Sequence, residues 1–217
     1  LVGSEMCIRD SYNALNENET GSANAAFGHY ALQSNTTGTA NTAFGQAALD
    51  SNTIGAGNVG VGKYALYSNV GGDYNVAMGM ESMRLNASGE RNVALGAYTL
   101  YTNTAGDKNV AIGNAAGYNN QTGSNNVFIG AEAGYAETGS NKLYISNSDT
   151  SNLITGDFST GDLSLGQTSG TVSILNALAV AGDLSLGGVA LENDNGTLTW
   201  NGIAVATGAG TVTIVDN

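Results

Sequence analysis

Hydrophobic side chains recur along most of this chain at a fixed 17-residue interval. One column of large apolar residues contains Phe27, Phe44, Val61, Met78, Leu95, Ile112 and Ile129. Two places earlier stands a second column, Ala25, Thr42, Val59, Val76, Val93, Val110 and Val127. Between them lies a small residue, Ala26, Ala43, Gly60, Ala77, Ala94 and Ala111, and finally Phe128. A fixed interval of this length indicates a repeat architecture with one structural unit per repeat.

Polar residues and glycines keep the same interval. Asparagine recurs at Asn24, Asn41, Asn58, Asn75, Asn92, Asn109 and Asn126, and again at Asn18, Asn35, Asn52, Asn69, Asn86, Asn103 and Asn120. Glycine recurs at Gly21, Gly38, Gly55, Gly72, Gly89, Gly106 and Gly123, and at Gly28, Gly45, Gly62, Gly79, Gly96, Gly113 and Gly130. A third apolar column, Leu15, Leu32, Leu49, Leu66, Met83 and Leu100, gives way to Gly117 and Gly134.

The Asn-Val-Ala-Ile-Gly part of each unit alternates large and small side chains, which predicts a short strand with one buried face. A helical solenoid is excluded because Gly or Asn interrupts every few residues, and each glycine inside a helix costs about 1 kcal/mol. The length of a unit accommodates two five-residue strands and two tight turns. We therefore predict an all-β fold: a left-handed parallel β-roll, or β-solenoid, with 17-residue coils over residues 12–146.

Each column then has an expected role. The glycines suit turns that need a positive φ, and stacked asparagines can form amide ladders between coils. We expect the Val, Ile and Leu columns to line the inside. Such a core is thin, so we expect three chains to pack along their Ala and Gly faces as a homotrimer.

The repeat ends near residue 146. Residues 138–145 repeat residues 122–129 at an interval of 16 rather than 17, and the column asparagine becomes Lys142. We interpret this run as the last coil, with the larger Phe128 and Tyr144 capping the stack.

In residues 147–217, apolar residues recur at every second position in short runs, and glycines and other turn residues separate these runs. This pattern predicts short strands of a β-rich shaft or connector. The apolar pairs are Leu163/Leu165, Val172/Ile174, Leu178/Val180, Leu184/Leu186, Leu198/Trp200, Ile203/Val205 and Val212/Ile214.

Residues 92–96 and 109–113 resemble the head repeats of trimeric autotransporter adhesins, whose units read Asn-Ser-Val-Ala-Ile-Gly and form a left-handed parallel β-roll. The adhesin unit is shorter, and the additional Ala-Leu-x-x-Asn-Thr segment, residues 48–53, is unusual for it. The longer unit more closely resembles repeats of phage tail-fibre proteins and of bacterial relatives that often end in an endosialidase-type intramolecular chaperone domain. This resemblance implies an attachment fibre or adhesin head.

Residues 1–11 share neither composition nor period with the rest and resemble a translated sequencing-adapter read. We expect this segment to be non-native and exclude it from the fold prediction, together with the single cysteine, Cys7. The chain is then expected to be a fragment of a longer protein, with both native ends missing.

The composition removes several functional classes. A net charge of −12 with only 6 Lys and Arg disfavours binding to nucleic acid. No apolar run approaches the roughly 18 residues of a membrane span, so we expect no membrane insertion. The 32 Gly and 27 Asn, with no Pro, agree with a turn-rich stacked fold.

We predict no catalytic, cofactor-binding or metal-binding residue. The only histidine, His29, has no counterpart in other repeats, and we expect it to face solvent. The acidic residues do not form a column, which disfavours both paired-carboxylate glycoside hydrolysis and a calcium-binding roll. Tyrosines beside turns, such as Tyr64, Tyr98 and Tyr101, either stack on sugars or pack as structural edges.

The sequence therefore predicts a structural and adhesive fibre segment without enzymatic activity. The favoured interpretation is part of a phage tail fibre that attaches to a host surface receptor, a glycan being one candidate. The alternatives are a bacterial trimeric surface adhesin head and, more distantly, an ice-binding or carbohydrate-binding β-solenoid.

Overall fold

A computed structural model describes the backbone of residues 8–166, 184–186, 189–194, 197–200 and 203–207, and the side chains of residues 11–166. The chain divides into two compact units, residues 1–171 and 172–217.

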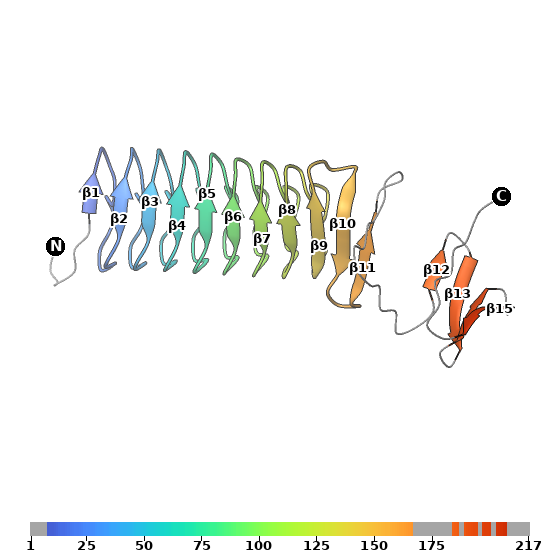
Figure 1. Cartoon of the computed structure of the whole chain (residues 1–217). Helices are drawn as coiled ribbons and strands as arrows, with labels where there is room; N and C mark the ends of the chain where they lie inside the picture. The colour runs from blue at the N-terminus through green and yellow to red at the C-terminus, as the bar shows by residue number, and fades with distance from the viewer. Residues whose placement is uncertain (1–7, 167–183, 187–188, 195–196, 201–202, 208–217) are drawn as a thin grey trace. The chain divides into compact units, whose positions relative to one another are not determined.

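The first unit is a β-solenoid built on one 11-stranded sheet whose strands follow chain order (Figure 1). The pairing of Ala25 with Thr42 recurs at the same interval from coil to coil, which gives the predicted 17-residue coil. In the described residues, the strands that run parallel are β1 (Ile8–Asp10), β2 (Ala25–Phe27), β3 (Thr42–Phe44), β4 (Val59–Val61), β5 (Val76–Met78), β6 (Val93–Leu95), β7 (Val110–Ile112), β8 (Val127–Ile129) and β9 (Lys142–Ser146). The all-β solenoid with 17-residue coils is thus confirmed.

The stack begins inside the segment that we excluded from the fold prediction. Strand β1 pairs in parallel with β2, with Ile8 opposite Ala25, so the 17-residue register extends to Ile8. The non-native origin of residues 1–11 stays a prediction.

Each inner coil contains a single three-residue strand, so the prediction of two five-residue strands per coil is wrong. After β2 the backbone leaves the extended region at Gly28 (φ 133°), Tyr30 (φ 63°) and Leu32 (φ 50°). The turns nevertheless stack, because Leu32 N donates to Ala48 O of the next coil at 3.0 Å. Inter-coil hydrogen bonding is therefore maintained without a second extended segment.

The small column, not the Val and Ile columns, faces the interior. Ala26 and Ala43 are fully buried, whereas Phe44 is 58% exposed and Met78 is 46% exposed. The expectation that all apolar columns line the inside is therefore wrong, and only the Leu column does so. The interior is tightly packed at this position, since even a Cβ added at Gly60 would lie 3.3 Å from Leu49 Cγ.

Both asparagine columns form the predicted ladders and are buried from Asn24 and Asn35 onward. In one, Asn52 Nδ2 donates to Asn35 Oδ1 at 2.9 Å and to Gly55 O at 2.9 Å. In the other, Asn75 N donates to Asn58 Oδ1 at 2.9 Å. These bonds satisfy amide groups that would otherwise be buried without partners.

Only one of the two glycine columns needs glycine for its φ. The column of Gly28 has φ between 112° and 143°, as predicted. The column of Gly21 does not require positive φ. It is glycine because the asparagine ladder occupies the adjacent space: a Cβ at Gly55 would lie 2.5 Å from Asn52 Oδ1.

In the last coils, an aromatic ring fills the interior in place of leucine side chains. Phe128 replaces the inward Ala of earlier coils and is fully buried. Gly117 and Gly134 replace the Leu column there. A Cβ at Gly117 would meet the Phe128 ring at 2.5 Å, and one at Gly134 would clash with the same ring. One ring thus fills space that two Leu side chains would otherwise occupy.

The parallel stack ends at β9, which confirms the predicted last coil. Val127 pairs with Leu143, a 16-residue interval. Strands β10 (Asn152–Asp157) and β11 (Asp162–Leu165) then extend the same sheet in antiparallel pairing.

The second unit contains a four-stranded antiparallel sheet of β12 (Leu184–Leu186), β13 (Val189–Asp194), β14 (Thr197–Trp200) and β15 (Ile203–Thr207). Three predicted pairs, Leu184/Leu186, Leu198/Trp200 and Ile203/Val205, lie in these strands. The pairs Val172/Ile174, Leu178/Val180 and Val212/Ile214 lie outside the described residues.

Candidate functional site: an apolar sheet face, a tyrosine row and a capping pocket

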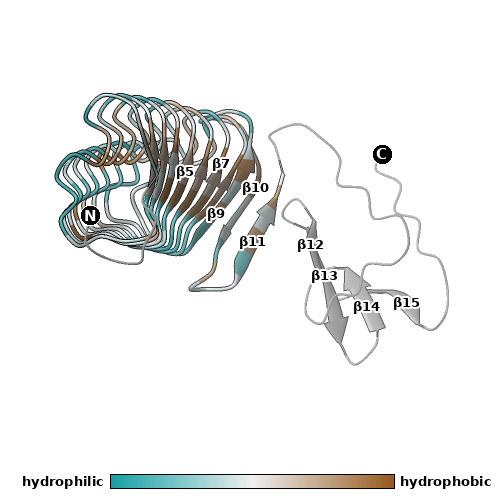
Figure 2. Cartoon of the chain, turned by 90° about the vertical axis from the view of Figure 1, so that its left-hand side faces the viewer, coloured by the Kyte–Doolittle hydropathy of each residue, from teal (hydrophilic) through white to brown (hydrophobic). Residues whose placement is uncertain are grey.

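The outer side of the solenoid sheet is apolar along its length. Its two outward columns, which contain Val93 and Leu95 in β6, are the Val and Ile columns that we expected inside. Figure 2 shows hydrophobic residues gathered on the strands, with hydrophilic residues in the turns. Ile112 is 40% exposed here, which is more than an apolar side chain in an ordinary core strand.

Both columns continue through the antiparallel strands. One passes from Val127 through Leu143 and Gly156 to Leu163. The other passes from Ile129 through Ile145 and Ile154 to Leu165. We call these two columns, from β2 to β11, the apolar sheet face. They contain no charged residue, although the chain carries 18 acidic and 6 basic side chains.

Aromatic rings stack along a turn on the surface of the solenoid. The ring centroids of Tyr101 and Tyr118 lie 5.0 Å apart with an interplanar angle of 4°. Those of Tyr118 and Tyr135 lie 5.0 Å apart at 12°. We call these three residues, which occupy the same position in successive repeats, the tyrosine row. Burial raises the pKa of the Tyr118 phenol, and the phenols of Tyr101 and Tyr135 raise it further.

The stacking bears on the sugar-binding hypothesis for these tyrosines. A sugar binds an aromatic side chain against the face of its ring. The Tyr118 ring has a neighbour on each face, and Tyr101 and Tyr135 each have one face covered. The geometry therefore favours the structural alternative for the row.

Arg84 occupies the next position of this column toward the N-terminus. Its guanidinium lies 5.7 Å from the Tyr67 ring centroid and 5.1 Å from that of Tyr64. It also pairs with Glu81 at 2.9 Å. The cation therefore separates Tyr67 from the tyrosine row.

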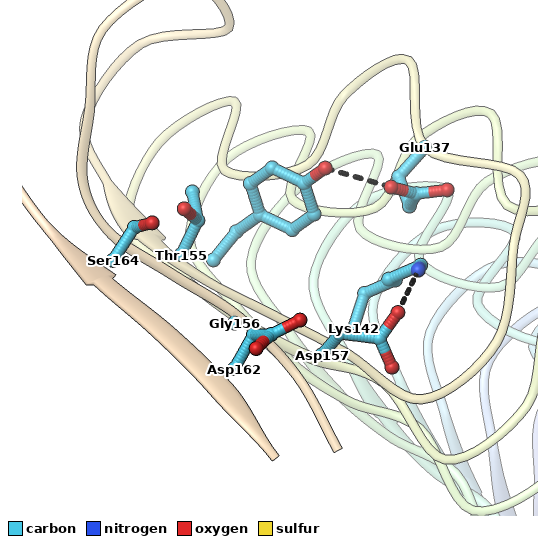
Figure 3. Close-up of a pocket in the computed structure, with 8 residues that line it drawn as sticks. Glu137, Lys142, Thr155, Gly156, Asp157, Asp162 and Ser164 are labelled. Atoms are coloured by element: carbon cyan, nitrogen blue, oxygen red, sulfur yellow. Dashed lines mark hydrogen bonds and ion pairs between the residues drawn. The ribbon is translucent and has the colours of Figure 1, made fainter. Parts of the chain in front are cut away.

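A polar pocket of about 260 Å³ lies where the coils end and the sheet continues (Figure 3). Its floor is the inner side of β9, β10 and β11, where Tyr144, Thr155 and Ser164 lie side by side, as do Lys142, Asp157 and Asp162. Glu137, from the last turn, completes the wall.

Glu137 substitutes for a missing coil. In an inner coil, Thr37 N and Gly38 N donate to the carbonyl oxygen of Thr53 in the next coil, at 3.1 and 3.3 Å. At the equivalent turn, Thr138 N and Gly139 N donate instead to Glu137 Oε1, at 2.9 and 2.7 Å. The carboxylate thus satisfies amides that face the end of the stack.

Tyr144 holds this carboxylate in place. Its hydroxyl donates to Glu137 Oε2 at 2.7 Å. Burial would raise the pKa of Glu137, but the hydrogen bonds from Tyr144, Gly139 and Thr138 and the nearby Lys142 charge together lower it. Burial and the bond to Glu137 raise the pKa of Tyr144 to about 12.

An ion pair connects β10 to the last coil. Lys142 Nζ lies 2.5 Å from Asp157 Oδ2, and the two residues are directly opposite on β9 and β10. The hydrogen bond from Lys142, with further bonds from Ser159, holds the pKa of Asp157 well below its usual value. The same pairing raises the pKa of Lys142. Both groups are therefore charged at neutral pH, and the ion pair holds β10 against β9.

The residues considered for chemistry in the sequence do not converge. His29 is exposed, as expected, with its ring 3.8 Å from that of Tyr30. Within the described part of the chain, no three His, Cys, Asp or Glu side chains lie close enough together to hold a metal ion. The pocket residues can satisfy the backbone amides of the last turn and hold β10 against β9. The absence of enzymatic activity stays a prediction.

Sequence reasoning missed Glu137, Asp157 and Asp162 as parts of one pocket. It noted the break in the columns at Lys142 and Tyr144, but the pocket acids belong to no column. The one signal was the change of interval from 17 to 16, which places Glu137 where Gln121 stands in the preceding coil.

The chain matches no protein-family model, no curated protein and no solved structure. Among the residues that the structure describes, no helix is long and apolar enough to cross a membrane.

Proposed function

We propose that this chain is a structural fibre segment that associates with copies of itself through the apolar sheet face. The observation that supports this proposal most directly is the outward orientation of the Val and Ile columns. Monomeric proteins rarely expose a contiguous apolar patch larger than a few hundred Å². Ten strands, β2 to β11, spaced by about 4.8 Å give this face a length of about 43 Å.

The repeat supports a second copy as the occupant of this face. Apolar rows about 4.8 Å apart interdigitate best with a surface that has the same spacing over the same length. Another copy of the chain provides that surface. The face is also uncharged, so association there does not bring the net charges of −12 into direct contact.

We propose a homotrimer, in which each copy contributes one sheet to a shared apolar axis. Three sheets around an axis cover each other's outer faces and leave the turns on the outside. The earlier hypothesis that Ala and Gly faces mediate the packing is replaced, because the small residues lie inside each coil.

The proposed role of such a solenoid is to project an attachment site from a phage tail fibre toward a host surface receptor, with a glycan as one receptor class. The longer repeat unit supports this role and the virion as its location. The alternative is the head of a bacterial surface adhesin, located at the cell surface. Binding of the fluorescently labelled full chain to candidate host cells, with and without glycosidase treatment, tests the attachment role.

The native mass of the full chain, by light scattering coupled to size exclusion, tests the assembly. We expect three times the chain mass of 21.8 kDa. Replacing Val93 and Ile112 with Glu should convert the trimer to monomer, because charges would be buried in an apolar interface. The matched control places Glu at Ala97 and Asn114, turn positions outside the apolar sheet face, and should remain trimeric. A monomeric wild-type chain would overturn the proposal.

A further inference from the structure

The tyrosine row places three oxidisable rings in a stack. Tyr101, Tyr118 and Tyr135 are partly exposed, and the centroids of neighbouring rings are 5.0 Å apart. Each ring comes from a different coil, so the stack connects side chains that are distant in the sequence and adjacent only because the coils stack.

We propose that the tyrosine row is a site of oxidative cross-linking, in which a one-electron oxidant couples neighbouring phenols into dityrosine. This inference concerns the outer turns and does not depend on the proposed self-association. The link would add a covalent cross-link between consecutive coils of the continuous chain, whose lateral contacts are otherwise hydrogen bonds and side-chain packing. A coil stack is held together by contacts between neighbouring units, so such a link opposes separation of the last coils.

The chemistry balances with an external oxidant of the peroxidase or photosensitiser class. Each of two phenols loses one electron to the oxidant and its hydroxyl proton to water. The two radicals form one carbon–carbon bond between ring positions ortho to the oxygens. The hydrogens on those carbons then move to the oxygens, which restores both aromatic rings. The product has two hydrogen atoms fewer than the reactants, and each ring needs to rotate about Cβ–Cγ to bring the ortho carbons together.

The surroundings make this row distinct from the other tyrosines. Tyr64 and Tyr67 lie 5.4 Å apart but perpendicular, at 90°, and both belong to one coil. Arg84 stands where a further ring would connect Tyr67 to the row. Tyr74 is 59% exposed and packs against Gly57 and Arg91 instead of another ring. Tyr12 and Tyr30 also come from neighbouring coils, but their rings lie 6.1 Å apart at 68° and are not stacked. In the described solenoid, parallel stacking of phenols from successive coils is therefore confined to the row.

The test is photo-oxidation of the full chain with tris(bipyridyl)ruthenium(II), persulfate and visible light. Peptide mapping by mass spectrometry should find Tyr101–Tyr118 and Tyr118–Tyr135 links within single chains, together with dityrosine fluorescence. Tyr118→Phe keeps the stacked ring but removes the central phenol, and it should lower the intrachain yield several-fold. The matched control, Tyr74→Phe, should leave that yield unchanged.

A gain-of-function variant keeps the proposal testable if Tyr118→Phe alters the local packing. Arg84→Tyr extends the stack to five rings, and new links from residue 84 to Tyr67 and Tyr101 should appear. The proposal is overturned if the links map to exposed tyrosines such as Tyr12 and Tyr74, or if Tyr118→Phe leaves the intrachain yield unchanged.

Discussion

Each coil places ordinary residues in backbone conformations that usually favour glycine. In one coil, Tyr64, Leu66 and Tyr74 have φ of 59°, 52° and 58°. A left-handed conformation costs a non-glycine residue about 1 kcal/mol. The neighbouring coils enforce it, because Tyr64 N donates to Gln46 O at 2.9 Å on one side and Leu66 N to Ser82 O at 3.0 Å on the other. The strain is therefore distributed along the stack and offset by inter-coil hydrogen bonds.

An exposed member of this set allows the strain to be measured. Lys108 has φ of 55° and an exposed side chain. We expect Lys108→Gly to be more stable than Lys108→Ala by about 1 kcal/mol, because both remove the charge and only Ala keeps a Cβ at positive φ. Chemical denaturation of the two variants measures the difference. Equal stabilities would mean that the coil relaxes around the Cβ without strain.

At the level of the coil, the interior is filled in two different ways. The last coils use the Phe128 ring packed against Gly117 and Gly134, whereas earlier coils use an inward Ala packed against a Leu. Gly117 has φ of 62°, close to the 48° of Leu100 in the preceding coil, so its backbone can accommodate a leucine. The nearest obstacle is the Phe128 ring, which a Cβ at Gly117 would approach to 2.5 Å, while the flexible end of Leu100, at 2.9 Å, would also have to shift.

This exchange predicts strong coupling between the two sites. Phe128→Ala should destabilise the solenoid by about 3–5 kcal/mol, because it leaves a cavity. Gly117→Leu alone should also destabilise it, by overpacking. The double variant, which restores the Ala and Leu pair of the inner coils, should be more stable than Phe128→Ala. Thermal unfolding of all four proteins gives the coupling energy, and additive effects would contradict the shared-space explanation.

The capping pocket makes the end of the stack sensitive to pH in a definite direction. The pKa of Glu137 is lowered from its usual value of 4.5, so its contribution to stability is complete above that pH and is lost as pH falls. The pKa of Tyr144 is raised to about 12, so its contribution is complete below its usual value of 10.0 and is lost as pH rises through 12.

Removing the hydroxyl should displace the acid limb of this profile. In Tyr144→Phe, Glu137 loses a hydrogen-bond donor to its charged form, and its pKa should rise. The melting temperature of the variant should therefore begin to fall at a higher pH than that of the wild type. Tyr135→Phe, which changes a tyrosine outside the pocket, should keep the wild-type acid limb. Coincident acid limbs for Tyr144→Phe and wild type would show that this bond does not stabilise the carboxylate.

For the whole molecule, the sequence was sufficient for the period, the strand position and the fold class. The alternation in Val93-Ala94-Leu95 identifies two faces but not which one is buried. That choice depends on the interior width, which the turns at positive φ and the Leu column determine together. Asp157 and Asp162 escaped prediction because an antiparallel return of the chain brings them to the pocket, and such a return leaves no periodic signal.

The uniform register predicts that a whole coil can be removed. Deleting residues 76–92 joins Asn75 to Val93 and should leave a folded solenoid one coil shorter, by about 4.8 Å. Deleting residues 76–83 places strands against turns and should unfold the repeat. Circular dichroism and small-angle scattering distinguish the two results.

The coil deletion also removes Arg84, which brings Tyr67 next to Tyr101 in the stack, so photo-oxidation should then produce a Tyr67–Tyr101 link. If the deletion protein folds but does not form that link, stacking of tyrosines from successive coils is not sufficient for their oxidative coupling.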